Sequence, residues 1–276
     1  MNNIALEIKN LTKEYSKGNK ALDNVSFSIE KGEIVGFLGP NGAGKSTTMN
    51  IITGYLLKTS GQVYIDGEEF DGINPKIKKK IGYLPEQPPL YNEMSVIEYL
   101  NFVYELKEVK LDKKQHIDDI IAKTALGTHR RRLIRNLSKG YRQRVGIAVA
   151  LIGDPEILIF DEPTVGLDPK QIIEIRELIK ELAVYQTVIL SSHIMQEIES
   201  IATKVIVINN GKIVANGTQK SLFEKTSRSS GEIVVEVDSG IDAVLSKIKK
   251  IKGVKSAEIK NSLENIFLEL TEEVNE

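Results

Sequence analysis

The sequence predicts an α/β fold with a parallel sheet at its centre, and two observations predict it. Apolar runs in EILIFDEP and QTVILSSH end in polar residues, as buried strands of a parallel sheet do. A third apolar run, EIVGFLG, leads directly into a glycine-rich loop and then into the helix-like stretch STTMNIITGYL. Strands that alternate with helices in this way build a parallel sheet covered by helices.

The other elements of the predicted fold follow in chain order. IALEIKNL and VSFSI are strand-like stretches on either side of the turn SKGNK, and GQVYIDG and KIGYLPE are two more. Helices are predicted over residues 46–56, 95–109, 116–125 and 140–152, and in the second of these the apolar residues recur at helical spacing. KVIVINNGKIVANG predicts a closing hairpin whose turn is Asn209–Gly211.

The length of 276 residues favours one large domain or two unequal ones. EKTSRSSG is polar and poor in apolar residues, so it predicts a linker. We therefore expect a main domain over residues 1–226 and a small domain over residues 231–276. The small domain reads as a β-α-β-β unit made of EIVVEVD, IDAVLSKIKKIKG, VKSAEIK and NIFLEL. Such a unit is marginal alone, so it is expected to dock on the main domain or on its own copy.

The composition argues against several classes of protein. A net charge of −1 argues against a dedicated nucleic-acid binder. The absence of cysteine excludes a disulfide framework and a zinc–thiolate site, and it suits a reducing cytosol. The longest apolar stretch, VGIAVALIG, is far shorter than the roughly 20 residues of a membrane span, and MNNIALEIKN lacks the apolar region of a signal peptide. Any role at a membrane is therefore expected to come through a partner.

The glycine-rich loop matches the phosphate-binding pattern G-x-x-x-x-G-K-[ST] between a strand and a helix, as that pattern requires. Backbone N–H groups of such a loop wrap phosphates, and the helix N-terminus adds about half a positive charge. Lys45 is expected to reach the β- and γ-phosphates, and the Ser46 hydroxyl to bind Mg²⁺. The alternative is a glycine turn with a surface lysine. The predicted nucleotide-contacting residues are Gly39, Pro40, Asn41, Gly42, Ala43, Gly44, Lys45, Ser46 and Thr47.

Two adjacent carboxylates follow the apolar run of ILIFDEP. A carboxylate at the end of a buried strand can hold Mg²⁺ through water, which suits Asp161. Glu162 points elsewhere in this interpretation and can take a proton from an attacking water. The alternative is an acidic cap between a strand and a loop.

GPNGAGKST, LSKGYRQR and ILIFDEP occur in this order, and together they resemble the nucleotide-binding subunit of the ATP-binding cassette (ABC) transporter family. The resemblance covers roughly Leu6 to Phe223 and is strongest to the bacterial export-type subfamily. It implies a P-loop NTPase cassette with a parallel-sheet core, an antiparallel N-terminal sheet and a helical subdomain at about residues 88–151.

The resemblance also implies roles for four residues outside these motifs. Tyr15 would stack on adenine, unless it is an ordinary tyrosine at a strand end. Gln87, in LPEQPPL, would touch Mg²⁺ and signal to the membrane partner, unless it is a polar turn residue. Asp168, in VGLDP, would belong to the loop at the dimer interface, although Val165-Gly166 replaces the usual small residues before it. His193, at the end of TVILSSH, would be the switch histidine near the γ-phosphate.

LSKGYRQR resembles the family signature, usually LSGGQRQR, and departs from it at Lys139 and Tyr141. Ser138 is a good N-cap, and Gly140 is expected to leave room for a phosphate against the backbone. In the family, two cassettes pair head to tail, and each signature closes on the ATP held by the other copy; Lys139 would add positive charge there. The alternative is a capped helix on a basic solvated face, because residues 129–144 hold seven Lys or Arg and no Asp or Glu.

The resemblance implies an ATPase with Glu162, His193 and Lys45 as catalytic residues. It implies a homodimer that binds two Mg·ATP and drives separately encoded transmembrane permease subunits, from the cytoplasmic face of the membrane and without a nucleic-acid partner. An importer cassette is the nearer alternative. A soluble ABC ATPase of translation or DNA repair is disfavoured by the single P-loop and by the lack of heptads between Thr47 and Leu137. A non-hydrolysing regulator is disfavoured because the catalytic residues and Asp161 are intact.

Overall fold

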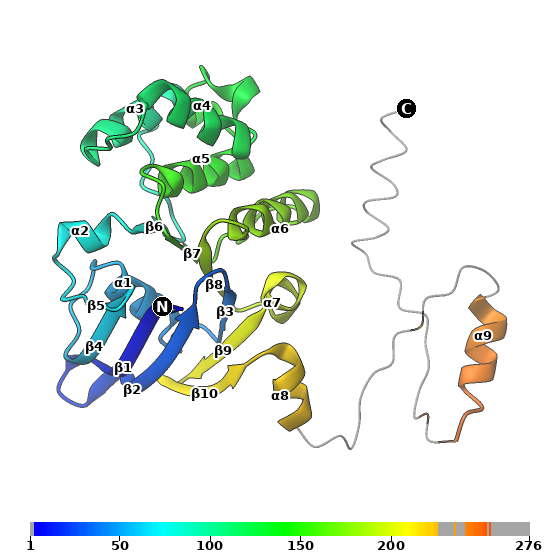
Figure 1. Cartoon of the computed structure of the whole chain (residues 1–276). Coiled ribbons are helices and arrows are strands. Elements are labelled where there is room, and N and C mark those ends of the chain that lie inside the picture. The colour runs from blue at the N-terminus through cyan, green and yellow to red at the C-terminus, as the bar shows by residue number, and fades with distance from the viewer. Residues whose placement is uncertain (1–2, 226–234, 236–240, 253, 255–276) are drawn as a thin grey trace. The chain divides into compact units, whose positions relative to one another are not determined.

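The computed structural model describes residues 3–225, 235, 241–252 and 254 (Figure 1). The chain forms two compact units, Met1–Phe223 and Glu224–Glu276. Helix α8 (Gln219–Lys225) spans the boundary, and helix α9 (Ile241–Ile248) is the described element of the second unit. This helix is shorter than the segment IDAVLSKIKKIKG that predicts it, and the predicted strands of the small domain lie outside the described residues.

An antiparallel sheet forms the N-terminal part of the first unit, as predicted. Its strand order is β2-β1-β4-β5. The predicted turn SKGNK separates the first two strands and contains Gly18, whose φ is +86°. The four strands are β1 (Ile4–Ser16), β2 (Asn19–Glu30), β4 (Ser60–Ile65) and β5 (Glu68–Glu69).

A second sheet has the strand order β10-β9-β3-β8-β7-β6. Its strands are parallel except β10, which pairs antiparallel with β9 across the predicted hairpin. The parallel core and the separate antiparallel sheet are therefore both confirmed. The strands are β3 (Ile34–Leu38), β6 (Ile81–Leu84), β7 (Ile157–Asp161), β8 (Thr187–Ser192), β9 (Lys204–Asn209) and β10 (Lys212–Gly217).

The parallel sheet is buried on both of its faces, which explains why its strands read as continuous apolar runs. Alternate residues of β7 pack into different clusters, because successive side chains of a strand point to opposite faces. Leu158 and Phe160 pack with residues of the helices, whereas Ile157 and Ile159 pack with residues of the antiparallel sheet. The sheet is thus held rigidly between two apolar layers, and its strand ends can position a site.

Three helices make up the segment predicted as a helical subdomain: α3 (Val96–Leu106), α4 (Lys113–Lys123) and α5 (Lys139–Leu151) (Figure 1). Ser95 opens α3 with a capping box to Glu98. Short 3₁₀ turns at Gly127–His129 and Ile134–Asn136 connect α4 to α5.

The helix predicted over residues 46–56 is shorter in the structure. Helix α1 spans Lys45–Ile52, because Gly54 adopts a φ of +71° and the next two N–H groups turn back to the carbonyl of Asn50. A left-handed glycine is a common helix end.

Three helices of the first unit besides α8 were not predicted from the sequence: α2 (Pro75–Lys78), α6 (Pro169–Ala183) and α7 (Met195–Ile201). The signal for α6 was present, since Asp168 is its N-cap, proline follows at the first position, and apolar residues recur at helical spacing. No helix in the described part of the chain is long and apolar enough to span a membrane.

Candidate nucleotide-binding site

A cavity of about 380 Å³ lies where the loops after β3, β7 and β8 meet. These strands are neighbours in the parallel sheet, so their C-terminal ends bring together segments that are far apart in the sequence. The volume falls in the range of small-molecule sites. The lining residues are Asn41, Gly42, Gly44, Lys45, Ser46, Thr47, Glu86, Glu162, Val165 and His193.

The glycine-rich loop joins β3 to α1, as its motif predicts. Gly44 adopts a φ of +114° directly before the helix, and a Cβ there would lie 2.8 Å from the carbonyl oxygen of Ala21. Lys45 begins α1, and its side chain is 5% exposed. Its Nζ donates hydrogen bonds to the carbonyls of Gly39 (2.7 Å) and Pro40 (3.3 Å). The loop therefore fixes the ammonium at the wall of the cavity.

Glu162 lies at the centre of the site. Its Oε1 is 3.4 Å from Lys45 Nζ, and its Oε2 is 3.0 Å from His193 Nδ1. The side chain is 8% exposed, so both partners compensate a carboxylate that is nearly buried. Its φ of +50° is unusual for a residue with a side chain, and such strain is typical of functional positions. This backbone turn directs Glu162 into the cavity.

Asp161 is the last residue of β7, and it is 3% exposed. Its Oδ1 accepts a hydrogen bond of 2.5 Å from the hydroxyl of Ser191, on the neighbouring strand β8. The same hydroxyl accepts the backbone N–H of Glu162 at 2.9 Å. Sequence reasoning missed Ser191, because its contacts depend on the register in which β7 and β8 pair.

His193 follows β8 and presents a half-exposed imidazole at the cavity. The turn that carries it is fixed by Ser192, whose hydroxyl donates to Glu197 Oε2 at 2.8 Å and accepts the N–H of Ile194 at 3.0 Å. The Nδ1 of His193 and Oε2 of Glu162 are 3.0 Å apart and share a hydrogen bond.

The donor set of the site fits a magnesium ion that arrives with a nucleotide. No cluster of three or more His, Asp or Glu able to hold a metal occurs among the described residues. Ser46 offers a hydroxyl at the cavity, and Asp161, which is buried and absent from the lining, offers a single carboxylate at the end of β7. Mg²⁺ is usually bound in this way, by one or two protein ligands together with phosphates and water.

Several residues predicted at the site are absent from the cavity lining, namely Tyr15, Gly39, Pro40, Ala43, Gln87, Asp161 and Asp168. Gln87 is exposed on the loop after β6, whereas its neighbour Glu86 lines the cavity. Tyr15 is near the end of β1 with 58% of its surface exposed, and Lys13 Nζ lies 5.3 Å from the centre of its ring. Asp168 accepts the N–H of Gln171 at 2.9 Å as the N-cap of α6. Tyr15, Gln87 and Asp168 therefore do not line the cavity to which the phosphate loop contributes.

The signature segment begins helix α5, and Ser138 is its N-cap, as predicted. The expectation that Gly140 leaves room for a phosphate against its backbone stays a prediction, but the place where a side chain on Gly140 would begin is already occupied. A Cβ on Gly140 would lie 2.5 Å from Oε1 of Gln171, so the side chain of Gln171 fills that space. Gln171 lies in the first turn of α6 and closes the signature from within the same chain.

The two departures from the usual signature each have a specific contact. The Nζ of Lys139 lies 2.1 Å from the position that a Cβ on Gly166 would occupy, so the ammonium fills the place of a side chain there. Tyr141 stacks on His129 with ring centroids 3.8 Å apart. Burial lowers the pKa of His129, and Arg132 lowers it further, which favours a neutral ring in the stack.

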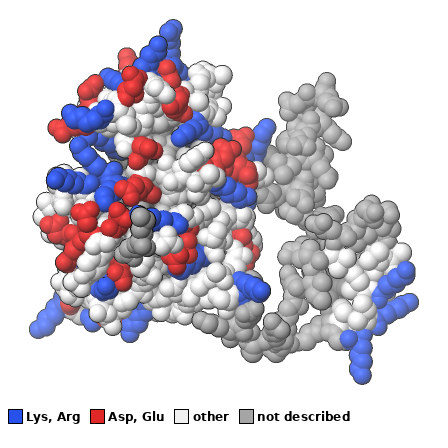
Figure 2. All heavy atoms as spheres, in the orientation of Figure 1, with Lys and Arg blue, Asp and Glu red and all other residues white. Residues whose placement is uncertain are grey.

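The basic segment at residues 129–144 is partly neutralised within the chain. Arg130 and Arg135 pair with Asp118 and Glu93, each at 2.6 Å, and Arg144 pairs with Glu174 at 2.7 Å. Figure 2 shows acidic and basic side chains intermingled over the visible face. The segment is therefore not a uniform basic surface, and Lys139 is a cation with no ion pair among the described residues.

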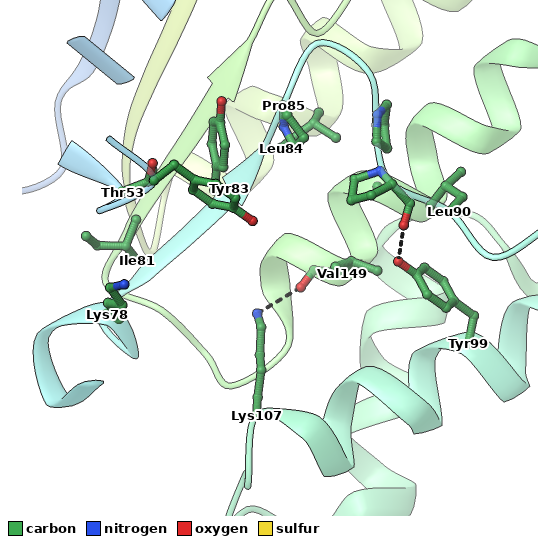
Figure 3. Close-up of a pocket in the computed structure, with 14 residues that line it drawn as sticks. Thr53, Lys78, Ile81, Tyr83, Leu84, Pro85, Leu90, Tyr99, Lys107 and Val149 are labelled. Atoms are coloured by element: carbon green, nitrogen blue, oxygen red, sulfur yellow. Dashed lines mark hydrogen bonds between the residues drawn. The ribbon is translucent and has the colours of Figure 1, made fainter. Parts of the chain in front are cut away.

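A second cavity, of about 230 Å³, lies between the end of β6 and the helices (Figure 3). Tyr99 closes one side and donates to the carbonyl of Pro89 at 2.7 Å. Lys107 closes another side, and its Nζ donates to the carbonyls of Val149 (3.0 Å) and Ile152 (2.8 Å) at the end of α5. No residue of the predicted nucleotide site lines this cavity.

Comparison with known proteins connects this geometry to one family. A family model described as ABC transporter matches residues 22–165. The lantibiotic transport ATP-binding protein SrtF of Streptococcus pyogenes is 40% identical over 210 residues, which are 76% of this chain and 89% of SrtF. The bacitracin transport ATP-binding protein BcrA of Bacillus licheniformis is 39% identical over 211 residues, 76% of this chain and 68% of BcrA.

A solved structure adds an assembly to the comparison. It is a dimeric ATP-binding cassette in a post-hydrolysis state, bound to ADP and Pi. It superposes with a TM-score of 0.70 at 29% identity, over 77% of this chain and 98% of that chain.

Proposed function

The chain belongs to the ABC transporter family and is an ATP-binding, ATP-hydrolysing subunit, and from this premise we propose that two copies clamp two Mg·ATP and drive separately encoded membrane subunits. The observation that carries the catalytic part of the proposal is the position of Glu162. Its carboxylate lines the cavity between Lys45 and His193.

Each side chain of the site has a proposed task in hydrolysis. The P-loop backbone and Lys45 hold the β- and γ-phosphates, while Glu162 takes the proton of the attacking water. His193 is oriented by its hydrogen bond to Glu162 and faces the γ-phosphate. Mg²⁺, held by Ser46 and through water by Asp161, would neutralise charge on the phosphates. Gln87 as a further Mg²⁺ contact and Tyr15 as the adenine stack belong to the same proposal.

We propose that the homodimer is head to tail, with Ser138, Lys139, Gly140 and Tyr141 of each copy meeting the ATP of the other and Asp168 in the interface loop. The dimeric cassette with 29% identity supports pairing of this kind. All of these residues lie within the unit Met1–Phe223, so we propose that this unit is sufficient for nucleotide binding.

We propose that the dimer works at the cytoplasmic face of the cell membrane, where its membrane subunits hold it. We propose export as the direction of transport. The similarity to the transport ATP-binding proteins for a lantibiotic and for bacitracin supports this direction over import.

Replacing Glu162 tests the proposal. Glu162→Gln keeps the shape of the side chain and hydrogen bonds to its neighbours, but it removes the base. Hydrolysis should fall by about 10²- to 10⁴-fold. ATP binding should persist, and an ATP-bound dimer should accumulate, as measured by size-exclusion chromatography with light scattering.

Glu174→Gln is the matched control for this change. Glu174 is partly exposed on α6, where it pairs with Arg144 away from the cavity lining. Its turnover should stay within about twofold of wild type. Near-normal turnover of Glu162→Gln would remove Glu162 from the role of base.

A further inference from the structure

We infer that Ser191 is a positioning residue for the metal and for the catalytic base at once. The inference rests on the proposed roles of Asp161 and Glu162. One hydroxyl, on strand β8, contacts both Asp161, the last residue of β7, and Glu162, which follows it. Ser191 lies in the stretch TVILSSH, but no role was predicted for it from the sequence, and its side chain is absent from the cavity lining.

The contact with Asp161 fixes the orientation of a carboxylate. Ser191 is fully buried, so its hydroxyl has no water to compete for it. It donates a buried hydrogen bond to Oδ1 of Asp161, and hydrogen bonds that carboxylates accept are among the stronger ones in proteins. With Oδ1 engaged in this way, the carboxylate cannot rotate freely, and Oδ2 is left to accept a water of the metal. Partners of this kind set metal affinity even though they do not touch the metal.

The contact with Glu162 holds the strained backbone. Glu162 has a φ of +50°, which residues with side chains rarely adopt. Its N–H is directed at Ser191 Oγ, 2.9 Å away, and the bond is buried. Strained conformations persist when their surroundings over-determine them. Ser191 is therefore part of what turns the Glu162 carboxylate towards Lys45 and His193.

The next residue of the strand supplies a matched control. Ser192 is also fully buried, and its hydroxyl likewise makes two hydrogen bonds. Its partners are Glu197 and the N–H of Ile194, so it holds the turn of His193 and not the carboxylates. If both serines only stabilised the fold, replacing either one by alanine would change metal affinity to the same extent.

The experiment measures metal affinity directly, without turnover. The full chain with ADP is titrated with Mn²⁺, as a probe for Mg²⁺, and bound Mn²⁺ is followed by electron paramagnetic resonance. Ser191→Ala should weaken Mn²⁺ binding by about 10- to 100-fold. It should also raise the Mg²⁺ concentration that gives half-maximal hydrolysis. Ser192→Ala should leave the Mn²⁺ affinity within about twofold of wild type.

Conservative variants keep the test decisive if Ser191→Ala is unstable. Ser191→Thr retains the hydroxyl and should retain Mn²⁺ affinity, whereas Ser191→Cys is of similar size but a weak donor and should lose it. Unchanged affinity in the Ala or Cys variant, or equal losses at Ser191 and Ser192, would overturn the inference. If wild type itself bound no Mn²⁺ with ADP, the proposed metal site would fail instead.

Discussion

Lys139 and Gly166 show how two unusual residues can depend on each other. Each departs from the usual family pattern at its own motif, and the structure places the lysine ammonium where a side chain on Gly166 would begin. The end of a lysine side chain is flexible, so an added methyl group at position 166 would move the ammonium without removing it. Because Gly166 has no side chain, it leaves room for the Lys139 ammonium in the loop that follows Glu162.

This contact gives a prediction about coupling. Suppose that the Lys139 ammonium, in this position beside Gly166, helps to bind the partner's ATP. Lys139→Met should then lower ATPase activity by about tenfold, which corresponds to the loss of one charge-assisted hydrogen bond. Gly166→Ala should cause a similar loss, and the double variant should be no worse than either single one. Steady-state ATPase assays of the three variants check this.

Gly127→Ala is the control, because Gly127 has a negative φ and no atom lies within 4 Å of its would-be Cβ. Its activity should match wild type. Additive losses in the double variant would show that Gly166→Ala acts through its own φ of +69° and not through Lys139.

The site residues that could be predicted from the sequence are those that belong to contiguous sequence motifs. Lys45, Glu162 and His193 meet because each follows a strand of one parallel sheet, and strand ends can be recognised locally. Ser191 and Gln171 could not be found in this way. Their roles depend on which atoms of other segments they reach, which is set by strand register and by the packing of α6 against α5.

At the scale of elements, Lys107 connects two helices of the helical segment. It is the C-cap residue of α3, and its ammonium binds the last carbonyls of α5, the helix that begins with the signature. A cation at a helix C-terminus is favourable because the last carbonyls of a helix carry partial negative charge; here the carbonyl of Val149 also accepts the N–H of Ile152. Burial nevertheless lowers the pKa of Lys107 to about 8, from 10.5.

This pKa predicts how stability changes with pH. Between about pH 8 and 10.5, Lys107 is protonated in a larger fraction of unfolded than of folded chains. Its contribution to the free energy of unfolding therefore increases as pH rises. Lys107→Met lacks the effect. Urea unfolding at pH 7.5 and at pH 10 should show wild type gaining about 1–3 kcal/mol relative to the variant.

Replacing the exposed Lys110 with methionine provides the reference, and that variant should keep the same pH response as wild type. An identical pH response in Lys107→Met would contradict the assignment.

Elements were predictable where burial leaves a simple pattern. The parallel strands are apolar on both faces, so they stand out as runs, and the hairpin of β9 and β10 turns at the expected asparagine and glycine. Helix α1 was predicted too long because the left-handed conformation of Gly54 ends it. A glycine inside an apolar stretch does not by itself indicate that conformation.

At the scale of the whole molecule, the head-to-tail dimer predicts that each ATP site needs Lys45 from one copy and Gly140 from the other. Two cassettes fused in tandem can carry Lys45→Ala and Gly140→Asp either on different copies or on the same copy. On different copies both defects fall in one ATP site, and the other site stays whole. On the same copy each site carries one defect.

We expect the tandem protein with changes on different copies to keep one occluded ATP, and the protein with both changes on one copy to keep none. The aspartate should be harmful because it sets a like charge against the γ-phosphate. Both proteins hold the same two substitutions, so their folding costs cancel. Radiolabelled nucleotide retained after rapid desalting measures the outcome, and reversed results would contradict the head-to-tail arrangement.

The strand order of the parallel sheet also determines when this sheet can form during synthesis on the ribosome. Ile34 of β3 lies beside Val188 of β8, a residue made about 150 positions later. At translation rates of roughly 5–20 residues per second, β8 is synthesised about 10–30 s after β3. During that interval the backbone of β3 has no neighbouring strand in the parallel sheet, because both of its neighbours, β8 and β9, come later in the chain. Nascent chains stalled before β8 should therefore be the ones that chaperones hold longest.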